Sequence, residues 1–182
     1  MRRGLERRAD SATTSDIERL LEELRSRSFG VLSTVTQEGR SHSVGVVYGI
    51  SSQKKTFEVY VMTRKHLKKA RNIAANPNVS FVVPLTRRLI GFIPPPCVQF
   101  QGKATIVDYR DHTGKEAFKS FFVGRQILRM YEGLSRQGET RTCFLRIIPD
   151  PVVFTYMLGY SIWEVRRRMQ IGTERVQILP EP

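Results

Sequence analysis

The chain has 182 residues, 40% of them hydrophobic, which suits one domain with a single core. Thirty basic residues against 17 acidic ones give a net charge of +13, which predicts an anionic ligand or partner. No stretch approaches 18 consecutive apolar residues and the N-terminus lacks the apolar segment of a secretory signal, so we expect no membrane span and a cytoplasmic location. The cysteines and histidines show no metal-ligand spacing, and reduced thiols are expected at Cys97 and Cys143.

Residues 1–13 are charged and then rich in Ser and Thr, without an apolar period, which predicts a mobile basic arm. The rest, 14–182, shows no internal repeat or composition break and is interpreted as a single domain with a C-terminal extension. A helix is expected from about Ser15. Its apolar residues recur at helical spacing and form one stripe: Ile17, Leu20, Leu21 and Leu24.

Three segments rich in Val, Thr and aromatic residues follow, at 29–36, 41–51 and 56–63. Short turns join them, with Gly39 at the permissive position of the first turn. They predict an antiparallel meander of three strands. A short helix is expected over 64–76, with Leu67, Ala70 and Ala74 on its apolar face, and Asn76-Pro77 ends it.

Two further strands are predicted at 78–84 and 97–108, and Gly102 in the second marks a bulge or a close backbone approach. A long amphipathic helix is expected over Gly114 to Leu134. Two more strands follow, at 141–149 and 151–159, separated at Asp150-Pro151. About seven short strands with few helices indicate a barrel or a sandwich, and closure into a barrel would remove exposed strand edges.

The segment after Thr63 contains the clearest candidate binding residues. A strand hands over to a helix that bears basic residues: Lys65, Lys68, Lys69 and Arg71. The start of a helix presents free N–H groups and the positive end of the dipole, so lysines and a hydroxyl there predict a phosphate site. The alternative, a solvated basic helix, has equal weight on these residues alone.

The order of several motifs is more specific than any one of them. Lys69, Asn72, Ile73, Asn76 and Pro77 match the pattern K-x-x-N-[IL]-x-x-[ND]-P, and the strand NVSFVV follows. The triplet LST before a glycine turn, then His42 and Tyr48, and the strand VQFQGKATIVD complete the series. On these motifs the chain, from about Ile17 to Thr155, resembles the FMN-binding split-barrel proteins of the pyridoxamine 5′-phosphate oxidase-like group.

The resemblance implies a mainly β fold with flanking helices, namely a six-stranded antiparallel split β-barrel of the FMN-binding type. It also implies a homodimer that holds two FMN molecules at the subunit interface. Lys69 would contact the FMN phosphate, and Thr63 with Met62 would lie against the phosphate, the ribityl chain or the ring edge. The other implied cofactor-binding residues are Ser33, Thr34 and Val35 through backbone amides, Val46, Val47 and Tyr48 beside the ring, Gln99 and Gln101 toward the partner's flavin, and Trp163 as an aromatic cover.

The chain also departs from the family pattern. Leu67 stands where a Ser or Thr often precedes the phosphate lysine, so phosphate binding is expected to rest more on Lys68, Arg64 or Arg71. The C-terminal segment ERVQILP has no Trp or His beside it, unlike the corresponding segment of true pyridoxamine phosphate oxidases. Oxidation of pyridoxamine phosphate is therefore not expected.

The leading hypothesis is a flavin-dependent oxidoreductase that acts on an unidentified small molecule and needs no protein acid or base. His42 is a possible proton donor, although a surface or turn histidine is the simpler interpretation. One alternative is a reductase that uses the deazaflavin F420, whose anionic tail would suit a basic surface. Another is a non-catalytic module that binds flavin or haem. Nucleic acid is not expected, because aromatic residues are not interleaved with the basic runs.

Overall fold

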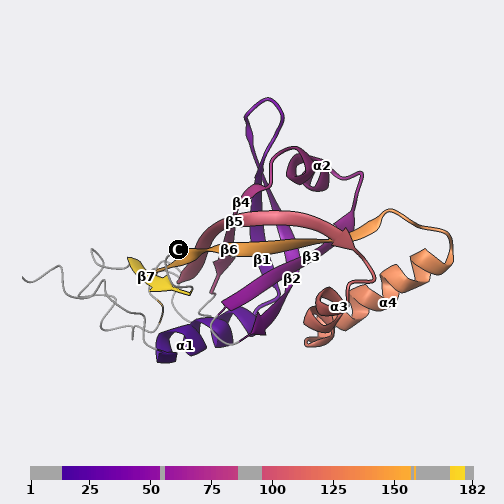
Figure 1. Ribbon diagram of the computed structural model, residues 1–182. Coiled ribbons are helices and arrows are strands. Elements are labelled where there is room, and N and C mark those ends of the chain that lie inside the picture. Colours follow the sequence, from indigo (N-terminus) through magenta and orange to yellow (C-terminus); the bar gives the residue numbers. More distant parts are fainter. Residues whose placement is uncertain (1–13, 54–55, 86–95, 157, 159–172, 179–182) are drawn as a thin grey trace, which may run out of the picture.

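The computed structural model describes residues 14–53, 56–85, 96–156, 158 and 173–178, and Figure 1 shows how the elements are arranged. The first helix and the first five strands lie where the sequence predicts them, and the predicted arm at 1–13 lies outside the described residues. In chain order the elements are α1 (Thr14–Arg25), β1 (Phe29–Val35), β2 (Ser41–Gln53), β3 (Thr56–Arg64), α2 (Lys68–Ala75), β4 (Asn78–Pro84), β5 (Cys97–Asp108), α3 (His112–Lys119), α4 (Phe122–Arg136), β6 (Thr142–Tyr156) and β7 (Thr173–Gln177).

Six strands close into an antiparallel barrel. β1 pairs with β2 on one side and with β4 on the other, and the ring continues through β5 to β6. It closes where β6 pairs with β3, which itself pairs with β2. The expected six-stranded antiparallel barrel with flanking helices is therefore confirmed. β7 lies outside this ring and pairs with the last residues of β6, Val152 to Tyr156.

Alternate side chains of the strands point into the barrel and form the main core, with Leu32, Phe81 and Phe100 fully buried. Helices α1 and α2 contribute apolar residues to the same core and lie at opposite ends of the barrel (Figure 1). The hydroxyl of the buried Tyr48 donates a hydrogen bond of 2.8 Å to the carbonyl of Leu24, which fixes β2 to α1. Among the described helices, none is long and apolar enough to cross a membrane.

The segment predicted as one long helix, Gly114 to Leu134, forms the two helices α3 and α4. Phe121 between them has an extended backbone (φ −134°, ψ 156°), so the helical hydrogen bonds stop there. This break lets Phe118 and Leu128 join one apolar cluster with Phe144, on the outer face of the barrel. Helical periodicity does not reveal such a bend, because both helices present apolar residues to the same surface.

One continuous strand, β6, replaces the two strands predicted on either side of Asp150-Pro151. The pairing of β6 with β3 ends at Ile147, and its pairing with β7 begins at Val152. Pro149 and Pro151 fall in the interval between these two ladders. A proline lacks the N–H that a ladder requires. Along this interval neither β3 nor β7 pairs with β6, so the missing N–H breaks no ladder hydrogen bond on that edge.

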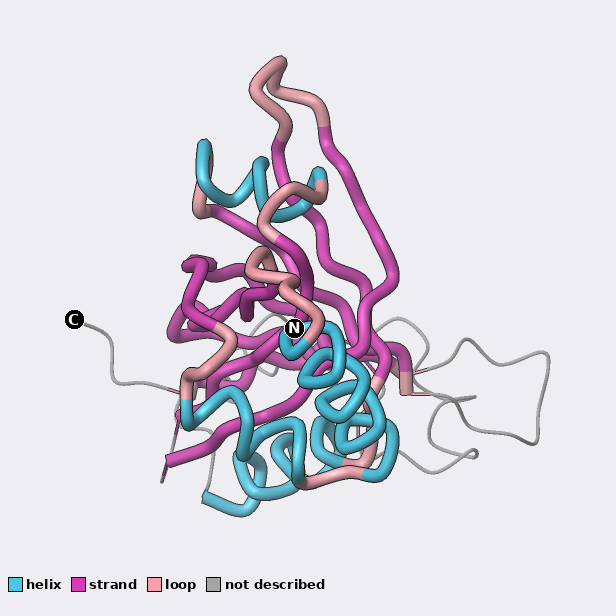
Figure 2. Tube along the Cα trace, turned by 90° about the vertical axis from the view of Figure 1, so that its right-hand side faces the viewer, coloured by secondary structure: helices cyan, strands magenta, loops and turns pink. Residues whose placement is uncertain are grey.

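β2 changes partners along its length. Its residues from Ser41 to Val47 pair with β1, and those from Tyr48 to Gln53 pair with β3. The β1–β2 hairpin projects from the barrel beside α2 (Figure 1, Figure 2). Gly39 in the hairpin turn has a φ of 75°, which confirms the predicted glycine turn. β3 continues beyond its last pair with β2, Val61, and Met62 to Arg64 pair with β6.

The bulge predicted at Gly102 is also confirmed. The register between β5 and β6 shifts between Phe100 and Gly102. A Cβ atom on Gly102 would lie 2.3 Å from the carbonyl oxygen of Ile148, closer than any side chain permits. The residue is therefore a glycine because two backbones approach each other there.

The basic helix starts later than predicted. α2 begins at Lys68, after a turn that contains Lys65, and its buried residues are Ala70, Asn72 and Ile73. Of the predicted apolar face, Ala70 is buried, but the prediction was wrong for Leu67, which is 38% exposed, and for Ala74, which is also exposed. A helix of eight residues buries little more than two turns of one face, and Ala70 and Ile73 at i and i+3 define that face.

Candidate functional site

The start of α2 has the features of an anion-binding site. No side chain caps this helix, and no acidic residue lies in its first turn. The amide of Ala70 donates a hydrogen bond of 3.0 Å to the carbonyl of Leu67. The amides of Lys68 and Lys69 precede the first amide of this helix that donates to a helical carbonyl, so they lie at the positive end of the helix dipole. The same two residues also carry ammonium groups.

Lys69 lies close to the end of β3. Burial lowers the pKa of the Lys69 ammonium below its usual value. Burial also raises the pKa of the Cys143 thiol to about 11, against the opposing charges of Lys65 and Lys69. Cys143 is the direct partner of Thr63 in the β3–β6 ladder. Lys65, Lys69 and Thr63 therefore lie around Cys143, at one corner of the barrel.

Thr63 brings an unsatisfied polar group to this corner. Its side chain is 1% exposed, and its hydroxyl has no hydrogen-bond partner among the described residues. A buried hydroxyl without a partner costs about 1–3 kcal/mol, so such groups in folded proteins usually meet a ligand or an ordered water. Thr142 also has a buried hydroxyl without a described partner, but it pairs with Arg64, whose side chain points to the opposite face of the strand from Thr63.

A hydrogen bond fixes α2 against the barrel. The side-chain amide of Asn72 donates to the hydroxyl of Thr34 over 2.9 Å, and this hydroxyl donates to the carbonyl of His42 over 3.3 Å. Asn72 and Thr34 are both buried. The position of the basic helix start is therefore set by a polar contact with the β1–β2 hairpin.

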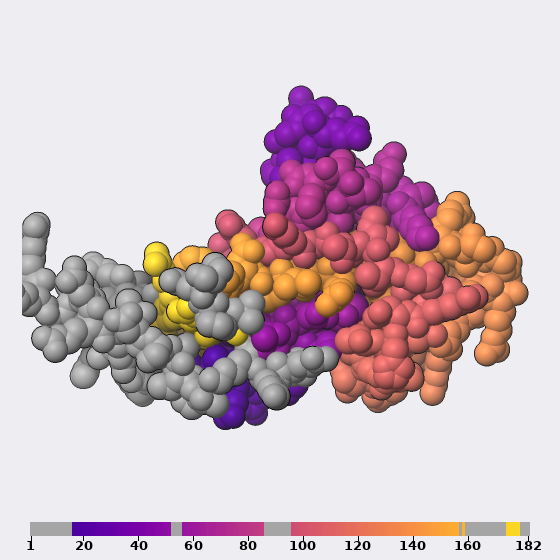
Figure 3. Space-filling view, viewed as in Figure 1, coloured from indigo at the N-terminus to yellow at the C-terminus, as the bar shows by residue number. Residues whose placement is uncertain are grey.

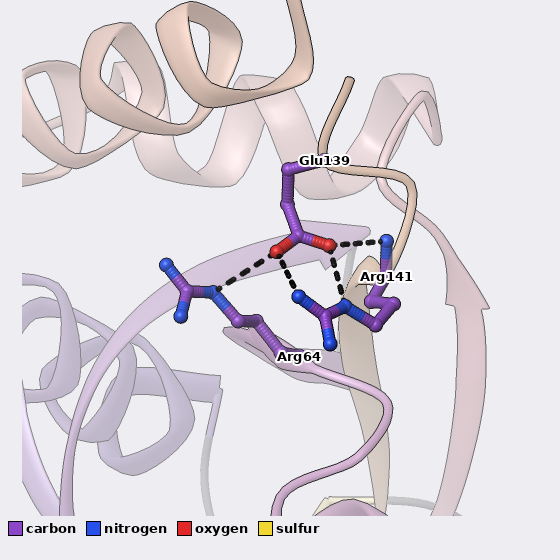
Figure 4. Close-up of polar contacts among 3 residues, drawn as sticks. All are labelled: Arg64, Glu139 and Arg141. Carbon is purple, nitrogen blue, oxygen red and sulfur yellow. Dashed lines mark hydrogen bonds and ion pairs between the residues drawn. The ribbon is translucent and has the colours of Figure 1, made fainter. Parts of the chain in front are cut away.

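A second polar cluster lies at the end of β3 (Figure 4). The carboxylate of Glu139 accepts hydrogen bonds from the backbone and the guanidinium of Arg141, and it lies 3.9 Å from Nε of Arg64. These bonds to Arg141 lower the pKa of Glu139 to about 2. Glu139 thereby ties the loop between α4 and β6 to the residue that follows Thr63.

The outer face of the barrel carries a row of polar side chains in register. Ser33 pairs with Ser43 and with Ser80, and Ser80 pairs with Gln101. We call these four residues the outer polar row. The hydroxyls of Ser33 and Ser43 are 2.8 Å apart, and Gln101 is exposed. The neighbouring row contains the exposed Gln99 beside Val82 and Val31, so the face combines hydrogen-bonding groups with apolar ones.

Seven of the sequence-predicted residues fall into two groups. Thr63 and Lys69 lie beside Cys143 near the start of α2, and the exposed Lys68 is the first residue of that helix. Ser33, Val35, Gln99 and Gln101 belong to the outer face of the barrel. The two groups adjoin through β1, because Asn72 of α2 is bonded to Thr34, the residue next to Ser33.

Four predicted residues turn their side chains elsewhere. Val46 and Tyr48 belong to the main core, and the hydroxyl of Thr34 accepts a hydrogen bond from Asn72. Met62 lies in the cluster beneath α3 and α4, on the other face of β3 from Thr63. At these positions only backbone atoms remain for a ligand on the outer face. Trp163 lies outside the described residues.

Sequence reasoning did not assign a role to Asn72, Glu139, Ser43 or Ser80. Asn72 carries a detectable signal, because an amide on the buried side of a short helix needs a partner. The two serines become visible only once the strand register is known. Both cysteines are free, as expected, and the described residues contain no group of three or more His, Cys, Asp or Glu that could hold a metal ion.

The sequence profile of the family described as pyridoxamine 5′-phosphate oxidase matches residues 17–155, which is most of the chain. The chain belongs to this pyridoxamine 5′-phosphate oxidase family. The match begins in α1 and ends in β6, so it covers the whole barrel. It thereby contains both groups of site residues. No curated protein matches the chain significantly.

Solved structures share the split-barrel fold of this family member. The haem storage protein HutZ from Vibrio cholerae has a TM-score of 0.59 at 20% identity, over 79% of this chain and 96% of HutZ. A haem-binding protein from Mycobacterium smegmatis has a TM-score of 0.63 at 14% identity, over 92% of this chain and 59% of that protein. General stress protein 26 from Bacillus anthracis has a TM-score of 0.51 at 22% identity, over 76% and 91%. At these identities the similarity establishes the fold.

Proposed function

We propose that this member of the pyridoxamine 5′-phosphate oxidase family is a homodimeric flavoprotein that binds FMN and acts as an oxidoreductase on a small molecule. The observation that carries the proposal is the buried, unpartnered hydroxyl of Thr63 beside Lys69 and the uncapped start of α2. A phosphate supplies acceptors for the hydroxyl and for the helix amides, and its charge matches the lysines. The residues at this corner therefore fit the phosphate end of FMN.

The outer face of the barrel suits the remaining part of the cofactor. An isoalloxazine ring needs a flat surface with apolar contacts and a few hydrogen-bonding groups, and the outer polar row beside Val31 and Val82 offers both. Phe29 on the same face of β1 is 52% exposed. A second copy related by two-fold symmetry would cover this face and enclose the ring.

The protein's role in this scheme is binding and orientation. The phosphate is held by Lys68, Lys69 and the first amides of α2, and the hydroxyl of Thr63 donates a hydrogen bond to one of its oxygens. Gln99 and Gln101 orient ring atoms of the flavin in the partner subunit. When bound, the flavin itself supplies hydride transfer. The amides and side chains of the outer face exclude water from one side of the ring.

Two threonine variants test the phosphate site. Thr63→Val removes the hydroxyl with little change of shape, so FMN binding is expected to weaken about tenfold or more, because a hydrogen bond to a charged group contributes about 1.5–3 kcal/mol. Thr142→Val is the matched control, because it removes a hydroxyl that is equally buried and unpartnered but faces the opposite side of the strand. Fluorescence titration with FMN measures both. Equal affinities for the two variants would contradict the proposed site.

Light scattering tests the subunit arrangement. A dimer has twice the chain mass of 21.0 kDa, about 42 kDa. A monomer at micromolar concentration would remove the shared site but would leave the phosphate corner intact, so the two parts of the proposal fail separately.

Haem is the second candidate ligand. HutZ is named as a haem storage protein, and the M. smegmatis structure is also that of a haem-binding protein. Haem propionates are anions, so the basic start of α2 could take a propionate in place of the phosphate. The absorption spectrum of the purified protein decides: flavin bands support FMN, a Soret band supports haem, and a band further to the blue than that of FMN supports F420.

A further inference from the structure

The helix α4 presents apolar side chains to solvent on the outside of the fold. Phe122 is 66% exposed, Val123 45% and Met130 55%, and no other described element has three large hydrophobic residues this exposed. Val123 and Met130 are seven residues apart, so they lie in line along the helix, and Phe122 borders them. We call these three residues the α4 stripe. Figure 3 shows α3 and α4 at one end of the molecule.

Basic residues flank the α4 stripe. Arg125, Arg129 and Arg136 are exposed and follow one line of the helix at i, i+4 and i+11, and Glu132 is the only acidic residue of α4. The guanidinium of Arg125 lies 5.9 Å from the centre of the Phe122 ring, so charge and apolar surface are adjacent. Within the described part of the chain, Arg129 and Arg136 form no ion pair.

The opposite face of α4 already serves the fold. Gly124 and Leu128 are buried against α3 and the barrel, and Leu128 belongs to the cluster of Phe118 and Phe144. The three residues of the α4 stripe are therefore not needed to pack α4 against the rest of the fold. Exposed apolar residues of this size cost solubility, and contiguous apolar patches of this kind usually mark interaction sites.

We propose that α4 docks this protein onto an anionic lipid surface, with the α4 stripe at the boundary between headgroups and acyl chains and the arginines on the headgroup phosphates. This combination of an apolar line and a basic line is the pattern of helices that lie in a membrane interface. The proposal is independent of the bound cofactor.

The charge pattern favours lipid over a second copy of the chain. A two-fold contact through α4 would bring the arginines of two copies together, whereas anionic headgroups neutralise them. Nucleic acid would also neutralise the arginines, but it offers nothing that buries Phe122, Val123 and Met130. The net charge of +13 acts in the same direction by attracting the protein to a negative surface.

Vesicle flotation tests the proposal with the full chain. We expect binding to vesicles of phosphatidylcholine with 30% phosphatidylglycerol, and about 100-fold weaker binding to pure phosphatidylcholine, because each of three basic residues near an anionic surface contributes about fivefold. Binding should weaken as salt is raised. Equal binding to both vesicles, or none to either, would overturn the proposal.

Paired variants separate the contributions. Phe122→Ser with Met130→Ser, and Arg125→Glu with Arg129→Glu, should each lower affinity for anionic vesicles by about tenfold or more. The controls are Ile148→Ser, an apolar residue 41% exposed on β6, and Arg40→Glu in the β1–β2 turn. Circular dichroism confirms that each variant is folded. Equal losses in the controls, or a change of mass by light scattering in the α4 variants, would show that this face has another role.

Discussion

Asn72 and Thr34 are joined by a buried hydrogen bond across 38 residues of sequence. Asn72 comes from the helix that presents the lysines, and Thr34 comes from β1, where its neighbour Ser33 belongs to the outer polar row. The bond therefore fixes the distance between the two halves of the proposed cofactor site. It also explains why an amide occupies a buried position in α2.

Removal of this contact should destabilise the protein. Asn72→Ala leaves the buried Thr34 hydroxyl without its donor, so the free energy of unfolding should fall by about 1–3 kcal/mol. Urea unfolding measures it. The companion variant Thr34→Val completes a double-mutant cycle, in which we expect a coupling energy of about 1 kcal/mol. Strict additivity of the two variants would mean that the bond contributes nothing to stability.

Lys69 should matter more for FMN than for the fold. Lys69→Ala removes a charge-assisted contact with the phosphate, so FMN affinity should fall about 10- to 100-fold. Riboflavin lacks the phosphate and should bind Lys69→Ala almost as well as the unchanged protein. Parallel fluorescence titrations with the two flavins measure the contrast, and Arg19→Ala, an exposed substitution on α1, is the control for loss of charge.

Equal losses for FMN and riboflavin would place Lys69 in the ring pocket or in the support of the fold. Lys69 is half-buried, so a small decrease in stability is expected as well. The FMN-to-riboflavin ratio is unaffected by such a decrease, which makes it the decisive quantity.

Substitution of Gly102 should disturb the barrel. Gly102→Ala places a Cβ atom where the carbonyl of Ile148 and the Cα of Pro149 already lie, so β5 and β6 must move apart. We expect a loss of about 1–3 kcal/mol in unfolding free energy, typical of overpacking. Thermal unfolding followed by circular dichroism measures it. The same substitution at Gly133, where a Cβ meets nothing within 4 Å, should be neutral or stabilising.

The Glu139 cluster predicts a pH dependence. The pKa of Glu139 falls from 4.5 to about 2 in the folded chain, so its carboxylate stabilises the fold above about pH 4.5, and this contribution is lost as the pH falls toward 2. Glu139→Gln should therefore lower the melting temperature at pH 6, and the difference from the unchanged protein should narrow as the pH falls from about 4.5 to about 2. A difference that is constant with pH would show that the carboxylate charge is not involved. Glu132→Gln controls for the change of net charge.

The barrel was predictable because its strands carry local signals. The Val, Thr and aromatic content of the first five strands distinguishes them from helices. The continuity of β6 could not be predicted from local sequence. Whether Pro149 and Pro151 break a strand depends on which strands pair beside them. The break at Phe121 likewise depends on the surface that α3 and α4 share.

The candidate site was predictable in part. Thr63, Lys68 and Lys69 are close in sequence, so their proximity could be expected, and Lys69 does lie near the Thr63–Cys143 pair. The side-chain directions of Val46, Tyr48 and Met62 could not be inferred. They depend on which face of each strand points into the barrel, and α3 and α4 cover one outer face so that both faces of β3 are apolar.

Closure of the ring through β3 and β6 has a consequence for synthesis of the chain. The ion pair between Glu58 and Arg146 spans 88 residues, and the ladder pairs of β3 with β6 join residues that are similarly far apart in the sequence. During translation β3 leaves the ribosome long before its partner exists, so its β6-facing edge stays open until the final strand of the ring emerges. Stable folding must therefore wait for β6, and a stalled chain that ends before it exposes an aggregation-prone edge.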